Sequence, residues 1–399
     1  MNAIELKDIV VISGVRTPIG RFGGTLKDTP VYDLGAHVIR HALERVGLKG
    51  DQVDQVVFGH CRQAGNGPNP ARTASVRGGI PVDVPVNTIN MACPSGMRSV
   101  ALAAQAIQLG ESEIIVAGGM DSMSTIPYLL KGARWEGFRM GPKTLEDGWS
   151  DSIDPLIGEG MGGTAENLVE KYKIAREEMD AFALSSHRKA AEARANGWFD
   201  EEIAPFTVPA KHKRPEALLE QDETIREDTS LEKLAKLPAA FRKGGSVTAG
   251  NACAMSDGAV AVVVTSREKA RALGAQPLFS IVSHSIAAVD PAYMGEGPAY
   301  AIPKALKGTG MKLGDMELIE INEAFAAQIL ADKRLLNYDE EKLNVHGGAI
   351  ALGHPTGISG ARILVTLYNA LRIRDMETGI ASICGGGGVA SAMIIRRET

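Results

Sequence analysis

Two distant segments of the chain follow the same residue pattern, and this repeat is the strongest constraint on the fold. Ser95–Arg98 opens an alanine-rich helical pattern, which leads to an apolar strand ending at Gly118-Gly119. Ser359–Arg362 has the same Ser-Gly-x-Arg form, and its helical pattern leads to a strand ending in the run Gly385–Gly388. The two spacings differ by only about three residues, which predicts a duplicated domain. Chance is the alternative, because the shared tetrapeptide is short.

Apolar runs and helical patterns alternate in both halves of the chain. In the first half we expect strands at 9–12, 53–58 and 113–117, with a helix at 33–46. In the second half we expect strands at 277–282, 316–321, 380–384 and 390–395. This alternation is typical of an α/β architecture.

The segment between the halves differs from them in amino-acid composition. It contains loops rich in methionine and glycine, a charged helix predicted from Ala165 to Asn196, and a polar segment at Lys211–Lys233. These features indicate an inserted lobe, which is a suitable place to hold a long ligand beside the paired core. We therefore expect an N-terminal half at 1–121 and 252–276, an inserted domain at 122–251 and a C-terminal half at 277–399.

Composition excludes several classes of protein. The net charge of -5 and the pI near 6.0 leave no basic surface for nucleic acid, and no apolar run has the length of a membrane span. The N-terminus lacks the pattern of a secretory or transit signal, so a cytoplasmic protein is expected. The four cysteines lie far apart without a CxxC pair, which favours reduced thiols over disulfides or a zinc site.

Cys93 is the first candidate for chemistry. It lies in Asn90–Met97, ahead of a helix predicted to run to about Leu109, and Pro94 suits the first helical position. At a helix N-terminus the macrodipole and unpaired N–H groups favour thiolate, so a lowered pKa and a nucleophile are expected. A buried structural cysteine is the alternative, and an isolated Cys would favour it.

Two glycine-rich segments support the catalytic interpretation. Asn344–Pro355 delivers His354 just before the second helix of the repeat, where an imidazole can accept a thiol proton and then donate a hydrogen bond to a thioester oxygen. Cys384–Gly388 places a thiol beside unobstructed backbone amides at a strand end, as in a base next to an oxyanion hole. Taken singly, His354 would be interpreted as a core histidine and the glycine run as a tight turn.

Competing functions have weaker support. A dinucleotide-binding fold would require a G-x-G-x-x-G turn after the first strand and an acidic residue about twenty residues later, and neither is present. The Cys and His spacing does not indicate a metal site. A protein that only mediates interactions would not need a cysteine before a helix, a glycine-delivered histidine and a Cys-Gly run together.

Longer motifs resemble the thiolase family over nearly the whole chain. In order, they are Asn69–Arg72, Asn90–Gly96, Ala117–Ser124, Thr164–Asn167, Val247–Asn251 with Asp257-Gly258, Asn322–Ala326, Gly347–Pro355 and Cys384–Gly387. The resemblance implies an α/β thiolase fold of five αβαβα layers, with two duplicated halves and an inserted loop domain. It also implies an acyltransferase that needs no cofactor beyond coenzyme A as substrate, and a homodimer or homotetramer.

The resemblance also implies roles for individual residues. Cys93 would be the acylated nucleophile, His354 its base and Cys384 the acid/base at the carbon acid. Asn322 would hold a water that forms one oxyanion hole with His354, and the amides of Cys93 and Gly386 would form the other. Arg226 would contact coenzyme A, and the acyl and pantetheine pocket would be lined by Met161, Phe241, Ala252, Cys253, Met294 and Phe325. For the nearby basic cluster Lys211–Arg214, a phosphate contact and a solvated loop remain equally open.

Four segments of the chain depart from the usual thiolase pattern. Gly160 replaces the histidine of short-chain enzymes, Cys253-Ala254 replaces Ser-Gly, His346 replaces asparagine, and Pro94 replaces a small residue. We expect these changes to lie near the substrate and to favour a longer, branched or aromatic acyl chain. The alternatives are a biosynthetic acetoacetyl-CoA thiolase, a decarboxylating ketoacyl synthase, and an acyl-CoA-binding subunit that needs an accessory protein. Asn322 and Cys384 argue against the synthase.

Overall fold

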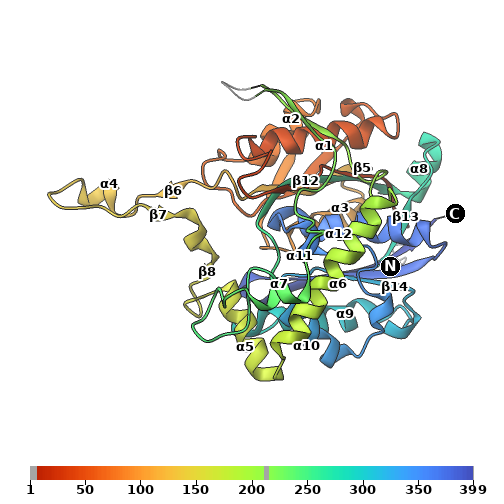
Figure 1. Ribbon diagram of the computed structural model, residues 1–399. Coiled ribbons are helices and arrows are strands. Elements are labelled where there is room, and N and C mark those ends of the chain that lie inside the picture. Colours follow the sequence, from red (N-terminus) through yellow and green to blue (C-terminus); the bar gives the residue numbers. More distant parts are fainter. Residues whose placement is uncertain (1–6, 211–214, 399) are drawn as a thin grey trace, which may run out of the picture.

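The computed structural model describes residues 7–210 and 215–398 (Figure 1). The basic cluster Lys211–Arg214 lies outside the described residues. None of the helices in these ranges combines the length and apolar character that crossing a membrane requires.

The core of the fold is one ten-stranded sheet made of two similar halves. The first half runs β4 (Val86–Ile89), β3 (Gln55–Gly59), β5 (Ile114–Ser122), β12 (Ser256–Ser266) and β1 (Ile9–Arg16), and β2 (Gly20–Arg21) also pairs with β12. The second half runs β14 (Leu318–Ile321), β15 (Thr378–Gly385), β16 (Val389–Arg397) and β13 (Phe279–Ala288). The halves meet where β1 pairs with β13 at Val10↔Ser280 and Val11↔Phe279.

Strand directions confirm the duplication. In the first half β3 and β5 are parallel, and β12 and β1 follow in antiparallel order. In the second half β14 and β15 are parallel, and β16 and β13 follow in antiparallel order. The repeated helix precedes the equivalent strand in each half, as α3 (Ser95–Leu109) before β5 and α12 (Thr356–Ile373) before β15.

Alternating side chains assign the helices to layers. In β1, Ile9 and Val11 face the core around α3 and α12, whereas Val10 and Ile12 face α1 (Val31–Glu44) and α2 (Pro70–Arg77). In the second half, the outer face packs against α9 (Gly297–Leu306) and α10 (Ala326–Leu336). The order is therefore outer helices, the first half of the sheet, α3 with α12, the second half of the sheet, and outer helices. These are the five predicted layers.

Glycines in the repeated tetrapeptides let the two central helices cross closely. A Cβ on Gly96 would lie 2.9 Å from the backbone nitrogen of Ala361, and a Cβ on Gly360 would lie 2.6 Å from that of Met97. Real Cβ atoms do not approach backbone so closely, so each helix requires the other's glycine. This reciprocal contact gives a physical reason for the repeat and brings the two helix N-termini together.

The predicted helix at 165–196 was wrong as a single element. The structure has α5 (Met161–Tyr172) and α6 (Arg176–Ala195), separated where Lys173 adopts a left-handed conformation with φ 49°. The N–H groups of Lys173 and Ile174 both donate to the Val169 carbonyl, which closes α5. No glycine or proline marks this end, so a stop signal is missing from the sequence.

The remaining elements lie mostly between β5 and β12 and around β14. They are β6 (Tyr128–Leu129), α4 (Ala133–Glu136), β7 (Glu146–Asp147), η2 (Gly148–Ser152), β8 (Ile153–Asp154), β9 (Glu159–Gly160), β10 (Phe206–Val208), β11 (Ala217–Leu219), α7 (Leu231–Ala235), α8 (Arg267–Leu273), η1 (Gly50–Gln52), η3 (Pro291–Glu296), η4 (Leu313–Asp315), η5 (Glu340–Lys342), α11 (Ala349–Leu352) and η6 (Gly386–Gly388). Figure 1 shows β6, α4 and β7 as an arm that extends away from the body.

Candidate active site

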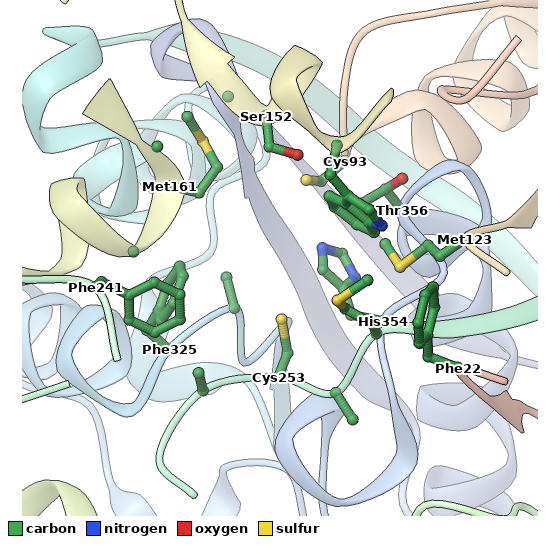
Figure 2. A pocket seen from close by; sticks show the side chains of 18 of the residues that line it. Phe22, Cys93, Met123, Ser152, Met161, Phe241, Cys253, Phe325, His354 and Thr356 are labelled. Atoms are coloured by element: carbon green, nitrogen blue, oxygen red, sulfur yellow. The ribbon is translucent and has the colours of Figure 1, made fainter. Parts of the chain in front are cut away.

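One cavity of about 1630 Å³ collects most of the predicted residues (Figure 2). Its lining includes Cys93, His354, Cys384, Gly386, Arg226, Met161, Phe241, Ala252, Cys253, Met294 and Phe325. All four cysteines of the chain are free thiols, and all four line this cavity. The side chains of Cys93, His354 and Cys253 face the same space in Figure 2. The two halves and the insert therefore all contribute to one site.

A constrained turn presents Cys93 ahead of α3. Ala92 has a φ of 52°, which a residue with a side chain rarely adopts. The Ser95 hydroxyl stabilises the turn, since it accepts from the Met91 N–H at 2.8 Å and donates to the Ala92 carbonyl at 2.5 Å. The helix begins at Ser95, one residue after Pro94, so the thiol projects from just outside the helix into the cavity.

The predicted lowering of the Cys93 pKa was wrong for the protein without substrate. Burial raises the pKa of this thiol above its usual range. The charge of Arg62 and the N–H groups of Gly386 and Cys93 itself act in the opposite direction, but burial outweighs them. The resting nucleophile is therefore a thiol, and its attack requires a base that removes the proton.

His354 is held in the tautomer that such a base needs. Gly353, with a φ of 93°, ends the short helix α11 and turns the chain so that His354 precedes α12. Ser359 Oγ donates its proton to the Pro355 carbonyl at 2.9 Å, so it must accept from His354 Nδ1–H, which lies 2.7 Å away. Nε2 then carries the lone pair, and it has no hydrogen-bond partner in the described chain.

Burial keeps both the base and the second thiol uncharged. It lowers the pKa of His354 to about 3, an effect that the charge of Arg362 increases. It also raises the pKa of Cys384 well above the usual thiol range, and the nearby Cys93 adds to this shift. Cys384 lies near the end of β15, beside Gly386 at the start of the glycine turn. A protonated thiol in this position can donate a proton to a carbanion formed in the cavity.

Asn322 lies behind the cavity surface, in the loop that follows β14. Its amide nitrogen and oxygen are buried and have no hydrogen-bond partner in the described chain. Both atoms are therefore available for the water contact that the family resemblance assigns to this residue.

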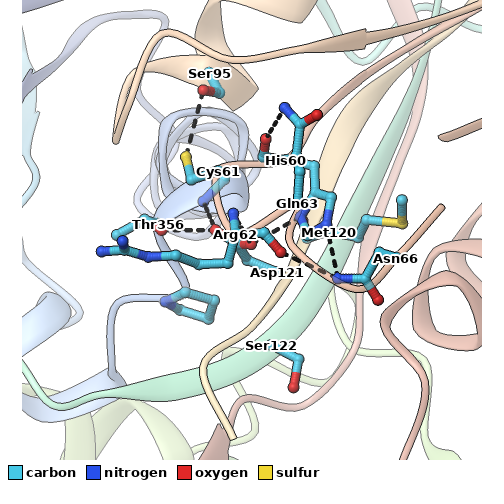
Figure 3. A network of polar contacts seen from close by, with 12 residues as sticks. His60, Cys61, Arg62, Gln63, Asn66, Ser95, Met120, Asp121, Ser122 and Thr356 are labelled. Carbon is cyan, nitrogen blue, oxygen red and sulfur yellow. Dashed lines mark hydrogen bonds and ion pairs between the residues drawn. The ribbon is translucent and has the colours of Figure 1, made fainter. Parts of the chain in front are cut away.

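A buried network that the sequence did not reveal connects the two halves (Figure 3). Asp121, in β5, pairs with the His60 ring at 2.8 Å and accepts from Thr356 Oγ1 at 2.6 Å and from the Gly357 N–H at 2.7 Å. Burial opposes its ionisation, but these hydrogen bonds lower the Asp121 pKa to about 2. The carboxylate thus fixes the start of α12, next to His354. Its only signal in the sequence was its place in the motif Ala117–Ser124.

Another part of the cavity combines residues of the insert with Phe325 of the second half. The Phe241 and Phe325 rings meet edge to face, with centroids 5.8 Å apart, and both line the cavity. A Cβ on Gly162 would lie 2.1 Å from the Phe241 ring, so glycine is required there. The Arg226 backbone N–H donates to His187 Nδ1 at 3.1 Å, which anchors the segment that presents the Arg226 side chain.

The four departures from the thiolase pattern do not share one location. Gly160 and Cys253-Ala254 line the cavity, as expected. His346 does not: it is fully buried and stacks on Trp198 with ring centroids 4.8 Å apart. Pro94 also lies off the cavity surface and packs against Gly385. The expected closeness to substrate was therefore wrong for His346, which packs away from the cavity, whereas Pro94 lies directly behind Cys93.

Comparison with known proteins identifies the class. The model of the thiolase N-terminal domain matches residues 9–268, and that of the thiolase C-terminal domain matches residues 275–397. The chain therefore belongs to the thiolase family and is an acyltransferase.

Individual relatives are similar to this chain over nearly its full length. The chain is 47% identical over 391 residues to a probable acetyl-CoA acyltransferase of Staphylococcus aureus, which covers 98% of this chain and 99% of the relative. Among solved structures, the Bacillus anthracis acetyl-CoA acetyltransferase superposes with a TM-score of 0.96 at 47% identity, covering 99% and 100% of the two chains. Human mitochondrial 3-ketoacyl-CoA thiolase gives a TM-score of 0.94 at 41% identity, covering 98% and 99%.

Proposed function

We propose that the chain catalyses CoA-dependent thiolytic cleavage of a 3-ketoacyl-CoA, and the reverse Claisen condensation of two acyl-CoAs, through an acyl group on Cys93. The observation that carries this proposal is the presence of a thiol and a neutral imidazole on the wall of one cavity, where Ser359 leaves the imidazole Nε2 free to accept a proton. Concentrations of the reactants, rather than the site, would set the direction.

The proposed reaction assigns a proton transfer to each group. His354 Nε2 takes the Cys93 thiol proton as Sγ attacks the 3-keto carbon, and the bond between C2 and C3 then breaks. The departing enolate of acetyl-CoA takes a proton from Cys384, which leaves a thioester on Cys93. The thiol of coenzyme A then gives its proton to the Cys384 thiolate and attacks this thioester. Cys93 leaves and takes back its proton from His354, which restores the resting enzyme. The N–H groups of Cys93 and Gly386, which interact with the Cys93 sulfur, are suited to stabilise the oxyanion of the attacked carbonyl.

We also propose that the acyl chain is bulkier than that of acetoacetyl-CoA. Gly160 lines the cavity without a side chain, and Cys253 is a weaker hydrogen-bond donor than serine. Thiolysis rates with acetoacetyl-CoA and with longer, branched and aromatic 3-ketoacyl-CoAs test this proposal. A higher kcat/KM for a bulkier substrate is expected. Efficient turnover of acetoacetyl-CoA alone would instead identify an acetoacetyl-CoA thiolase, and no turnover of any substrate would favour a subunit that requires an accessory protein.

The remaining expectations concern partners and location. We propose that the enzyme acts in the cytoplasm as a homo-oligomer and uses no cofactor besides coenzyme A as substrate. Apolar side chains on the arm support self-association, since Trp135 is 90% exposed and Phe138 is 76% exposed. Light scattering of the purified protein tests the oligomeric state, and a monomer at all concentrations would contradict it.

A further inference from the structure

Arg62 brings a cation to the cavity without a carboxylate partner in the described chain. It follows β3 and lines the cavity together with Cys93. The only hydrogen bond that its guanidinium makes to a described residue runs from Nη2 to Ser152 Oγ, at 2.9 Å. The guanidinium also stacks on Trp149, with Cζ 4.7 Å from the ring centroid. The Arg62 Nε–H and the Trp149 indole N–H are both buried and have no partner among the described residues.

Two other arginines on the same cavity are neutralised by acidic side chains. Arg242 pairs with Glu170 at 2.7 Å and with Glu159 at 3.5 Å, and Arg194 pairs with Glu227. Arg62 therefore differs from these two arginines in charge balance. Its guanidinium is held by a hydroxyl and an aromatic ring, both neutral groups.

Two acidic residues in this part of the fold do not pair with the Arg62 guanidinium. The Asp121 carboxylate accepts from the Arg62 backbone N–H, the His60 ring, Thr356 and Gly357, and Figure 3 shows the Arg62 side chain extending away from it. Asp154 also lines the cavity; its Oδ1 accepts from the Leu156 N–H, and its Oδ2 has no hydrogen-bond partner among the described residues. Neither carboxylate forms an ion pair with the guanidinium in the described chain.

Arg62 is within electrostatic reach of the reacting groups. After burial, its charge is the largest influence on the Cys93 pKa, which it lowers, and it also lowers the pKa of His354. An acyl group attached to Cys93 would therefore lie in the field of this cation. A partly buried cation without a counter-ion favours an anionic ligand, and a guanidinium fork matches a carboxylate in geometry.

We propose that Arg62 binds a carboxylate on the acyl chain of the substrate, so that the enzyme prefers 3-ketoacyl-CoAs with an anionic end. This inference rests on the proposed thiolase function and specifies its substrate class. Ser152 and Trp149 hold the guanidinium in place.

The test compares two thioesters that differ only at the chain end. One is 3-oxoadipyl-CoA, which ends in a carboxylate, and the other is 3-oxohexanoyl-CoA, which ends in a methyl group. The readout is the ratio of their kcat/KM values in thiolysis, because any effect of Arg62 on Cys93 reactivity acts on both substrates and cancels. A second pair, one methylene longer, allows for the depth of the pocket.

For the wild-type enzyme we expect about a tenfold to hundredfold preference for the carboxylate-ended thioester, as for a charge-assisted hydrogen bond. Arg62→Gln should bring this ratio to about one or below. The matched control is Arg242→Gln, which removes a paired arginine from the same cavity and should keep the wild-type ratio.

Three outcomes would overturn the inference. They are a wild-type ratio of one or less with both pairs, a parallel loss for both substrates in Arg62→Gln, and an equal change of ratio in the control. A contact between Arg62 and a phosphate of coenzyme A would give the parallel loss, since both probes carry the same coenzyme. If the wild-type enzyme cleaves only the methyl-ended thioester, the thiolase function stands and this inference fails. If it cleaves neither and Cys93 is not acylated, the proposed function itself fails.

Discussion

The two halves of the molecule present different reactive side chains from the same place on the same scaffold. Cys93 precedes α3 and His354 precedes α12, and a proline follows each of them. Hydrogen-bond partners make the difference. The Cys93 sulfur interacts with the N–H groups of Gly386 and Cys93, whereas His354 Nδ1 donates to Ser359. Duplication accounts for the shared position, and local partners turn one half into a nucleophile and the other into a base.

The largest expected effect comes from removing the nucleophile. Cys93→Ala should lower kcat by at least about 10⁴-fold, because the covalent route is lost while the rest of the site remains. Thiolysis kinetics of the folded variant, checked by circular dichroism, measure the loss. Retention of more than a small fraction of wild-type activity would show that the first half does not supply the nucleophile.

Removing the base, which the second half supplies, should lower kcat by less than removing the nucleophile does. His354→Ala should lower kcat by roughly 10²- to 10⁴-fold, the usual contribution of a general base. Single-turnover kinetics should place the loss in the acylation of Cys93. Normal acylation with slow release of the acyl group would contradict the role of His354 in activating the thiol.

The helix crossing can be tested separately from the chemistry. Gly360→Ala would place a methyl group 2.6 Å from the Met97 backbone nitrogen, so the free energy of unfolding should fall by about 1–3 kcal/mol. Gly314→Ala is the matched control, since a Cβ there meets no atom within 4 Å. Denaturant unfolding of both variants measures the difference. Equal stability would contradict the close contact of α3 and α12.

A smaller loss of kcat is expected when His354 is kept but loses the hydrogen bond that orients its ring. Ser359→Ala deletes the acceptor that fixes Nδ1–H, so kcat should fall by about tenfold while KM changes little. Ser283→Ala removes another hydroxyl, which donates to the Ala305 carbonyl away from the cavity, and it serves as the control. Wild-type kcat in Ser359→Ala would mean that the tautomer is fixed in another way.

The protonation states of Cys93 and His354 predict how the reactivity of Cys93 depends on pH. Because burial raises the pKa of Cys93 and lowers that of His354 to about 3, the free enzyme should hold a thiol and a neutral imidazole at pH 7. Alkylation of Cys93 by iodoacetamide should therefore accelerate only as the pH rises above the usual thiol pKa of about 8.5. An inflection below pH 7 would instead indicate a preformed thiolate.

The sequence predicted seven strands of the central sheet and the duplication, because apolar runs and the Ser-Gly-x-Arg repeat are local signals, and the family resemblance supplied the layers. It did not predict β4 or the long central strand β12. It also led to the residues of the cavity through the family resemblance. It did not predict the break at Lys173, since no glycine or proline marks the end of α5. It also missed the pairing of Asp121 with His60 and Thr356, which forms only when distant strands and helices meet.

Electrostatics were the least predictable feature of the site. The position of Cys93 before a helix suggested a lowered pKa, but that argument left out the cost of burying a charged sulfur. In the same way, His346 is adjacent to catalytic motifs in the sequence yet packs on Trp198 outside the cavity. Burial depends on the whole fold, so residue spacing alone cannot supply it.

The most direct test of the central claim is to locate the acyl group on the enzyme. The protein is incubated with 3-oxohexanoyl-CoA, quenched in acid and digested, and the peptides are analysed by mass spectrometry with Cys93→Ser as the control. The account predicts a butyryl thioester on the peptide that carries Cys93, and none on that peptide from the variant. An acyl group on Cys384 instead, or cleavage of the substrate without any acyl-enzyme, would contradict it.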